Sequence, residues 1–298
     1  YCLWGFAMSD EGYIEPGLVA STTLAFLRGE RESQGPKPTA FGTSMRASSA
    51  HGCERSLALD AAQVPECEEI GHETLLAFKL GDAMHDLVQR GVAAMFPDFK
   101  AEVPVDLRPF GYDVSGSADG VMVEGDELTV HEIKTMKPYP FNLSMTSGAP
   151  KLGDILQGGI YAYGMGAEAI RFIYICKETD KRSGRVPGDT QEFRLRMGDM
   201  VDEAGDTVKS LVENELMRLQ RISESAADGV IPPRDIPGVG LVDSPVRYQA
   251  DRGQPWNCRF CRHNSTCRVM ESGPVPVEFA ASFVSEAWTA PKPVDVAA

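Results

Sequence analysis

The chain has 298 residues, of which 43% are hydrophobic and 24% are charged, the composition of an ordinary globular protein. This length allows one large domain or two smaller ones, and no apolar run approaches the roughly 20 residues that span a bilayer. With 43 acidic and 29 basic residues, the net charge of −14 excludes a general nucleic-acid coat, but not a nucleic-acid enzyme with a local basic groove.

The start of the chain lacks a basic segment followed by a long apolar one, so we expect no secretory signal. Seven cysteines are an odd number at low density, which argues against a disulfide scaffold. We therefore expect a cytoplasmic protein without a membrane partner.

The first third of the chain predicts a loop and two helices. Residues 1–50 are rich in Gly, Pro, Ser and Thr, which is typical of loops. A helix is expected near SSAHGCERSLALDAA, with Ser48 or Ser49 as its cap. A second is expected over residues 73–96, because apolar residues recur there at helical spacing. These residues are Leu76, Leu80, Met84, Leu87 and Val88.

After Pro97 the pattern changes to period two. Short strands are expected over 101–107, 113–124 and 127–135. A helix over 152–165 and a strand over 169–178 follow.

A long amphipathic helix is expected over 197–225, then a Pro-rich connection over 231–255 and a frayed end over 289–298. The apolar face of this helix comprises Val201, Val208, Leu211, Val212, Leu216 and Leu219. The order of elements predicts an α/β sandwich.

The segment SGSADGVMVEGDELTVHEIKT predicts a hairpin that gathers charge on one face. Gly125-Asp126 is a reasonable two-residue turn, and pairing symmetric about it places Asp119 opposite Glu132. Lys134 points to the same side, because side chains two apart on a strand share a face. The same register pairs Val121 with Val130 and Val123 with Leu128.

Two carboxylates this close repel each other unless a cation lies between them. Mg²⁺ or Mn²⁺ suits carboxylate oxygens, and Lys134 could then stabilise developing charge or orient a water nucleophile. The alternative is a solvated ion-pair cluster at a strand end. The register argues against it, because the charges occupy core-face positions.

Asp119, Glu132 and Lys134 in this arrangement resemble the PD-(D/E)xK nuclease superfamily, although Ala118 stands where the family name has Pro. GDAMHD supplies His85 and QGGIY supplies Gln157 and Tyr161, which are similar to motifs of the RecB-type branch. The resemblance implies a restriction-endonuclease-like mixed sheet flanked by helices.

The resemblance also implies roles for these residues. His85, Asp119 and Glu132 would bind Mg²⁺ or Mn²⁺, with the Ile133 carbonyl as a further ligand. Lys134 would position or activate the attacking water. The remaining pair, Gln157 and Tyr161, would brace the site or touch DNA phosphates.

The stretch WNCRFCRHNSTCR carries Cys258, Cys261 and Cys267, and a tetrahedral metal site needs a fourth ligand. Cys2, Cys53, Cys67 and Cys176 are the candidates. Cys176 ends an apolar strand pattern and is expected to be a buried hydrophobe, whereas Cys53 opens a helix upstream of His85. Spacing alone allows structural zinc or an iron–sulfur cluster.

One upstream and three downstream cysteines resemble the iron–sulfur nucleases of the RecB-type branch, which include CRISPR-associated and phage exonucleases. Arg55 fits the C-x-R pattern of that group. The resemblance implies a [4Fe–4S] cluster held by four cysteines: Cys53, Cys258, Cys261 and Cys267. It divides the chain into an extension (1–44), a nuclease domain with the cluster (45–270) and a C-terminal tail (271–298).

The sequence therefore predicts a metal-dependent DNA exonuclease in recombination, repair or DNA processing, acting on single strands or duplex ends. A recombination or CRISPR-adaptation partner protein is compatible with it. A basic groove, or else only solvated surface, is expected at Lys137, Lys177, Lys181, Arg182 and Arg185. The alternatives are a non-catalytic DNA-end-binding subunit and a zinc-stabilised restriction-like endonuclease.

Overall fold

The computed structural model describes residues 26, 29, 41–67, 72–201, 205–236, 240–241, 258, 261–270 and 273–287. The chain divides into two compact units, Tyr1–Lys37 with Ile70–Leu80 and Pro38–Glu69 with Gly81–Ala298. The second unit holds every candidate site residue. In the described part of the chain, no helix has the length and hydrophobicity needed to cross a membrane. Most of the expected extension 1–44 and the expected frayed end 289–298 lie outside the described residues.

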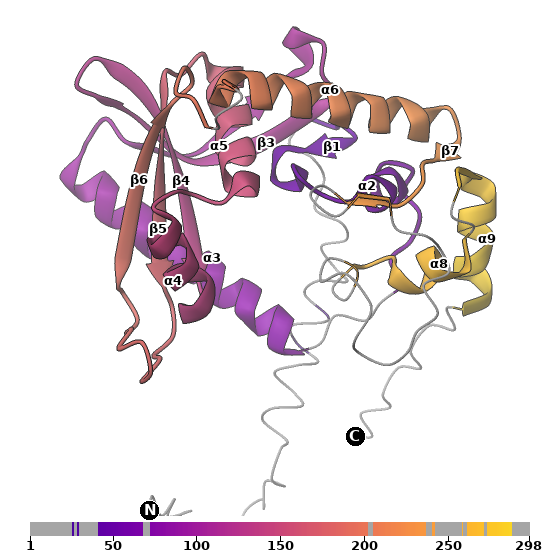
Figure 1. Cartoon of the computed structure of the whole chain (residues 1–298), viewed down its shortest axis with the longest axis horizontal. Coiled ribbons are helices and arrows are strands. Elements are labelled where there is room, and N and C mark those ends of the chain that lie inside the picture. The colour runs from indigo at the N-terminus through magenta and orange to yellow at the C-terminus, as the bar shows by residue number, and fades with distance from the viewer. Residues whose placement is uncertain are drawn as a thin grey trace, which may run out of the picture. The chain divides into compact units, whose positions relative to one another are not determined.

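A six-stranded mixed sheet forms the centre of the second unit (Figure 1). Strands β2, β3 and β4 form an antiparallel meander, β5 runs parallel to β4, and β6 is antiparallel to β5. The short β1 is parallel to β3. The strands are β1 (Met45–Arg46), β2 (Lys100–Asp106), β3 (Val114–Glu124), β4 (Glu127–Met136), β5 (Ala169–Cys176) and β6 (Thr190–Arg196).

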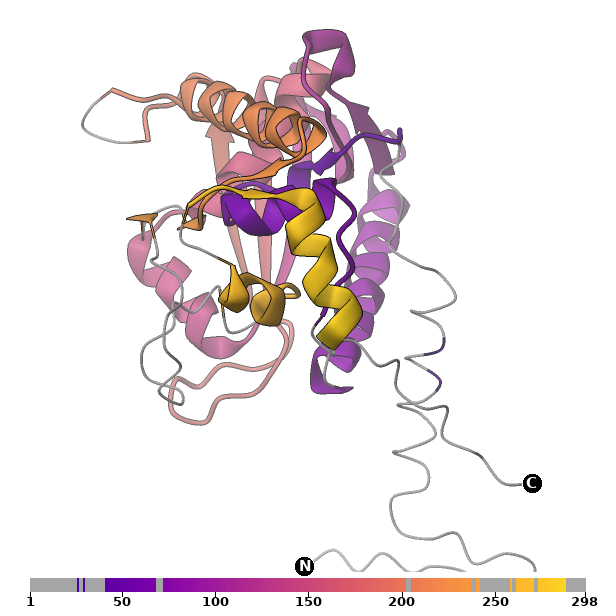
Figure 2. The ribbon, with the colours of Figure 1, turned by 90° about the vertical axis from the view of Figure 1, so that its right-hand side faces the viewer.

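Helices cover both faces of the sheet (Figures 1 and 2). On one face, Met84 and Val88 of α3 pack on an isoleucine cluster of β4 and β5. On the other face, α5 and α6 close the main core, which includes Phe172, Ile160 and Val212. The helices are α2 (Glu54–Ala61), α3 (His72–Met95), α4 (Pro138–Ser147), α5 (Leu152–Met165), α6 (Val208–Ala227), α8 (Asn264–Val269) and α9 (Val277–Ala287). The mixed sheet flanked by helices, the restriction-endonuclease-like arrangement expected from the sequence, is confirmed.

Short elements complete the second unit. They are the 3-10 helices η1 (Ala47–Ser49) and η2 (Arg108–Phe110) and the strands β7 (Val230–Ile231), β8 (Asp235–Ile236), β9 (Gly240–Leu241) and β10 (Val275–Pro276). The pair β7 and β10 joins the end of α6 to the segment before α9, because Ile231 pairs with Val275.

The predicted hairpin register is confirmed where the strands pair. Val121 lies opposite Val130 and Val123 opposite Leu128. Gly125 has φ of 70°, which a glycine adopts without steric cost, so the two-residue turn forms where expected.

Two helix starts differ from the expectation. Ser48 and Ser49 lie in η1, and the residue that caps α2 is Cys53, so the predicted serine cap is wrong. Helix α6 begins only at Val208, because Thr207 and Ser210 form a reciprocal capping box there. Four predicted apolar residues of α6 are fully buried, namely Val208, Val212, Leu216 and Leu219.

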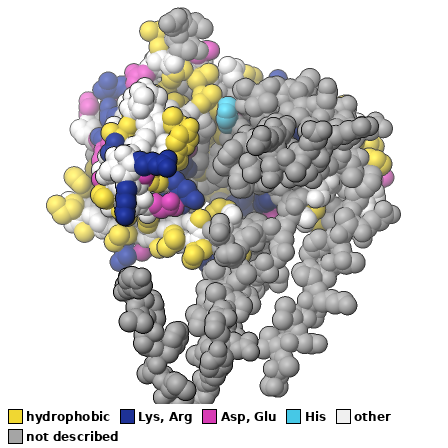
Figure 3. Space-filling view, turned by 60° about the horizontal axis from the view of Figure 1, so that its bottom comes forward, with side chains coloured by type: hydrophobic (Ala, Val, Ile, Leu, Met, Phe, Trp, Pro, Cys, Tyr) yellow, Lys and Arg dark blue, Asp and Glu magenta, His cyan; other side chains and the backbone are white. Residues whose placement is uncertain are grey.

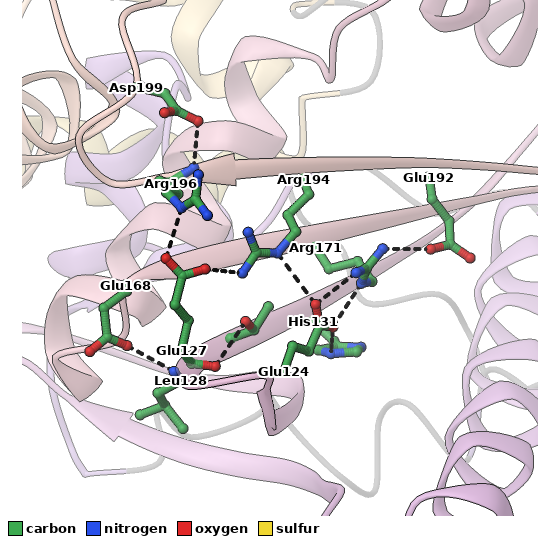
Figure 4. Close-up of polar contacts among 11 residues, drawn as sticks. Glu124, Glu127, Leu128, His131, Glu168, Arg171, Glu192, Arg194, Arg196 and Asp199 are labelled. Atoms are coloured by element: carbon green, nitrogen blue, oxygen red, sulfur yellow. Dashed lines mark hydrogen bonds and ion pairs between the residues drawn. The ribbon is translucent and has the colours of Figure 1, made fainter.

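An ionic network joins β3, β4, β5 and β6 at the turn end of the hairpin (Figure 4). Arg171 donates to both carboxylate oxygens of Glu124, each over 2.7 Å. Arg196 and Arg194 pair with Glu127, and their hydrogen bonds lower the pKa of Glu127 to about 2. The network holds the edge strand β6 to the hairpin without involving the candidate site residues.

Candidate functional site

Strand β4 carries a buried carboxylate beside a lysine. The side chain of Glu132 is 0% exposed, and its Oε1 lies 2.5 Å from Lys134 Nζ. Its other oxygen, Oε2, has no hydrogen-bond partner among the described residues. Burial raises the pKa of Glu132 to about 8, although the charge of Lys134 opposes this shift. Glu132 therefore takes up a proton near neutral pH unless a cation replaces it.

Asp119 occupies the place where β3 and β4 separate. Its Oδ2 accepts a hydrogen bond from the backbone N–H of Ile133 over 2.7 Å. Its Oδ1 lies 3.5 Å from Nδ1 of His85, which α3 brings in. Burial alone would lower the pKa of His85, but the hydrogen bond and charge of Asp119 outweigh it and leave the pKa raised. The structure thus brings His85, Asp119 and the backbone N–H of Ile133 together, whereas the predicted metal ligand is the Ile133 carbonyl.

Helix α5 brings Gln157 and Tyr161 to Lys134. Lys134 Nζ donates to Gln157 Oε1 over 2.9 Å, and Gln157 Nε2 donates to the Tyr161 hydroxyl over 3.3 Å. Tyr161 is only 2% exposed, so its position favours bracing the site over touching DNA. Gly116 makes room for this ring, since a Cβ there would lie 2.6 Å from Tyr161 Cε1.

Two further residues join the site without having been predicted. Gln89 of α3 donates from Nε2 to Glu102 Oε1 over 2.7 Å and to the Asp119 carbonyl over 2.9 Å. Glu102 has φ of 50°, a conformation that is uncommon for non-glycine residues. The meander register places Glu102 between the pairs Ala101–Gly120 and Val103–Ala118, so a pairing argument could have found it.

Asp154 on α5 is a third addition. The Tyr174 hydroxyl donates to Asp154 Oδ2 over 2.5 Å, and the backbone N–H of Lys151 donates to the same hydroxyl over 3.0 Å. The charge of Asp154 helps to raise the pKa of both Glu132 and Lys134. The negative charge of Asp154 on α5 therefore influences the protonation of two site residues on β4.

The four predicted cysteine ligands line one cavity of about 220 Å³: Cys53, Cys258, Cys261 and Cys267. Burial is the main reason that the pKa of Cys53 rises to about 11, and it also raises that of Cys261. Two other cysteines do not line this cavity. The Sγ of Cys67 accepts from the backbone N–H of Thr266 over 3.3 Å, and Cys176 is fully buried in the main core.

Two buried arginines support the cysteine cavity. Arg234 lines it and donates from Nε to Cys267 Sγ over 3.2 Å. Arg55 of α2 donates to the carbonyls of Pro232 and Gly273 over 2.9 and 2.6 Å. Both side chains are almost completely shielded from solvent. Together they tie α2 to the C-terminal segments that carry the three other cysteines.

The cavity suits a metal ion or a metal–sulfur cluster by its chemistry, because cysteine thiolates bind both. In the described ranges, no group of three or more His, Cys, Asp or Glu side chains is arranged to hold one metal ion.

The carboxylates of this candidate site suit a divalent cation by their chemistry. Asp119 is held by His85 and the Ile133 N–H, whereas Glu132 faces Lys134. The unsatisfied, fully buried Oε2 of Glu132 is the atom that a cation would satisfy.

The five predicted basic residues lie just before α4 and on the loop between β5 and β6. Lys137 is the residue before α4, and its Nζ lies 3.9 Å from Glu178. Arg185 donates from Nε to Asn142 Oδ1 of α4 over 2.8 Å. Lys181 and Arg182 are exposed, and Lys177 is half-buried. Figure 3 shows basic side chains gathered with hydrophobic ones on the lower face of the view in Figure 1.

No family model matches the sequence, and no curated protein matches it. Among solved structures, SSO0001 is similar over 86% of this chain and 98% of its own, at 16% identity and a TM-score of 0.44. The alkaline exonuclease LHK-Exo from Laribacter hongkongensis is similar over 64% of this chain and 93% of its own, at 15% identity and a TM-score of 0.45.

The complex of LHK-Exo with dAMP is similar over 62% of this chain and 89% of its own, at 17% identity and a TM-score of 0.43. The assignment of function therefore depends on the side chains of the site.

Proposed function

We propose that this protein is a divalent-metal-dependent deoxyribonuclease, an exonuclease that acts on single strands or duplex ends and carries a [4Fe–4S] cluster. The observation that carries the proposal is the fully buried Glu132, whose Oε2 lacks a hydrogen-bond partner in the described structure. A buried carboxylate with an unsatisfied oxygen is costly. A bound cation beside Asp119 and Lys134 would remove that cost and serve phosphodiester hydrolysis.

Asp119, Glu132 and His85 are the residues that would hold Mg²⁺ or Mn²⁺, with the Ile133 carbonyl as a further ligand. The cation would supply Lewis-acid activation of the phosphodiester. Glu102 and Gln89 support Asp119 from β2 and α3 through the hydrogen bonds of the Gln89 amide.

Lys134 is suited to stabilising negative charge. Burial alone would lower its pKa, but the adjacent Glu132 outweighs burial and leaves the pKa raised. Lys134 therefore stays cationic at neutral pH and can hold the water or the phosphate oxygens as charge develops. Gln157 fixes its ammonium group and is fixed in turn by Tyr161.

The test is the double variant Glu132→Ala/Lys134→Ala in a Mn²⁺ assay with 5′- and 3′-end-labelled single and double strands. We expect activity to fall by about a hundredfold or more, because both charge stabilisation and metal binding are lost. The matched control is Lys209→Ala/Glu213→Ala, which removes the same two charges from an exposed pair on α6. Full cleavage by the first variant would show that these residues are not catalytic.

The cluster has its own test. Anaerobic purification should give a brown protein that contains iron and sulfide. A colourless protein with one zinc ion per chain would overturn the cluster and favour the zinc-stabilised restriction-like endonuclease, which would also cut circular DNA. If neither linear nor circular DNA is cleaved but DNA ends are bound, the non-catalytic subunit is the better account.

A further inference from the structure

Two segments, 133–153 and 177–189, carry more basic than acidic residues. Residues 133–153 contain three lysines and no acidic residue, in a protein with a net charge of −14. The loop 177–189 contains four basic and three acidic residues. The first segment begins within β4, and the loop follows β5.

The structure joins the two segments. Arg185 of the loop donates to Asn142 of α4, and its guanidinium lies 5.3 Å from the ring centroid of Phe141. The loop's acidic groups have partners of their own, since Asp189 lies 3.6 Å from Arg185 and Asp180 accepts from Ser183 over 2.7 Å. Glu178 lies 3.9 Å from Lys137, and Lys181 and Arg182 are the exposed basic residues of the loop.

Helix α4 and the loop also carry exposed apolar side chains. Tyr139 on the first turn of α4 is 74% exposed, although tyrosine usually buries its ring. Leu143 and Val186 are each about half exposed. We define the α4 surface as Lys137, Tyr139, Leu143, Lys181, Arg182 and Val186. Figure 3 shows such a mixture of basic and hydrophobic side chains on the lower face.

The α4 surface continues directly from the candidate active site. Lys137 follows Lys134 by three residues, which is about 10 Å along a strand. Lys134 points toward α5, where it contacts Gln157, and Phe141 of α4 packs into the main core on that same face. A strand of nucleic acid that runs along this segment from Lys134 would reach Lys137 and Tyr139 next.

We propose that the α4 surface binds single-stranded DNA and directs it toward the candidate active site. Tyr139 stacks on an unpaired base, and the phosphates are contacted by Lys137, Lys181 and Arg182. Aromatic stacking requires a base that is free of its partner strand, whereas a duplex presents only phosphates to such a surface. The proposal rests on the proposed function and specifies its substrate.

Fluorescence anisotropy with labelled oligothymidine and with a hairpin duplex, in EDTA so that nothing is cleaved, tests it. For Tyr139→Ala we expect a roughly tenfold loss of affinity for the single strand, the size of one lost stacking contact. Tyr139→Phe keeps the ring and should bind as wild type does. Lys181→Ala/Arg182→Ala should weaken binding. It should also make the slope of log K against log [salt] shallower, because about two phosphate contacts are lost.

The matched control is Phe110→Ala, which removes another half-exposed aromatic ring, on η2 and outside the α4 surface. Tighter binding of the duplex than of oligothymidine would overturn the proposal, as would undetectable single-strand binding or unchanged binding by Tyr139→Ala. If Tyr139 contributes to binding but no DNA is cleaved in Mn²⁺, the DNA-binding role of the α4 surface is supported and the nuclease activity is contradicted. If DNA is cleaved but Tyr139→Ala binds as wild type does, the nuclease activity is supported and the role of the α4 surface is contradicted.

Discussion

Arg234 places its Nε 3.2 Å from the sulfur of Cys267 and its NH2 group 3.1 Å from the carbonyl of the same residue. This is a buried cation in contact with a predicted cluster ligand. Burial alone would lower the pKa of Arg234, but the nearby cysteines outweigh it and leave the pKa raised. A positive charge at this position would stabilise the negative charge of thiolate ligands, the form in which cysteine binds metals.

Arg234→Met should therefore weaken the cluster while keeping much of the side-chain volume. We expect iron to be lost to a chelator about tenfold faster, because a hydrogen bond to a charged sulfur contributes about 1.5–3 kcal/mol. The decay of visible absorbance after anaerobic purification measures this. Arg196→Met, at an exposed position of the ionic network, is the control. Equal decay rates for both variants would show that Arg234 has no such role.

The cysteines should fall into two groups. Cys53→Ala and Cys261→Ala should each abolish cluster binding and lower the thermal midpoint alike, because each removes one of four ligands around one cavity. Cys67→Ala and Cys176→Ala should keep the iron content of the wild type. Iron per chain and a thermal melt are the measurements. Loss of iron in Cys67→Ala but not in Cys53→Ala would reassign the fourth ligand.

The metal-free protein should lose stability as the pH rises. Glu132 has a pKa of 4.5 in the reference state and about 8 when folded. The folded state therefore holds this proton more tightly, and the free energy of unfolding falls between these two pH values. Above about pH 8 the carboxylate is charged in both states, and no further loss arises from this group.

Thermal unfolding across this range, with EDTA and with Mn²⁺, measures the effect. Mn²⁺ should offset the fall in the free energy of unfolding, because a bound cation replaces the proton on Glu132. The double variant Glu132→Gln/Lys134→Met removes both titrating groups and should show a flatter profile in EDTA. A profile as steep as that of the wild type would assign the pH dependence to other residues.

Gly159 lies where α5 packs on α6, and a Cβ there would lie 2.4 Å from Val212 Cγ2. Gly159→Ala should lower the free energy of unfolding by about 1–3 kcal/mol, because the two helices must separate. Gly91→Ala in α3 is the matched control. A Cβ there meets nothing within 4 Å, so this change should be neutral or stabilising. Denaturant titration of both variants compares them directly.

Alternation and turn residues predict most of the sheet, whereas the roles of His85, Gln157 and Tyr161 come only from the family resemblance. The hairpin register depends only on a two-residue turn and alternation, so the relation of Asp119 to β4 could be anticipated. Helix α5 was predicted with its observed bounds, Leu152–Met165, and it carries Gln157 and Tyr161 to Lys134. The roles of these residues remain predictions.

Other features depend on contacts that no local pattern reveals. Helix α4 was missed because Pro138 and Pro140 resemble chain breakers, although proline fits the first turn of a helix. Strand β6 was missed because its charged residues pair with Glu124 and Glu127 across the sheet. Leu87 belongs to the predicted apolar face of its helix, yet it is 63% exposed.

The hydrogen bonds of Arg55 to Pro232 and Gly273 bridge 177 and 218 positions of sequence. During synthesis, α2 leaves the ribosome long before either carbonyl exists. Until both carbonyls are present, Arg55 lacks these two hydrogen bonds, so α2 is held less firmly on the growing chain. A chain truncated before Gly273 should therefore be less stable than the full chain.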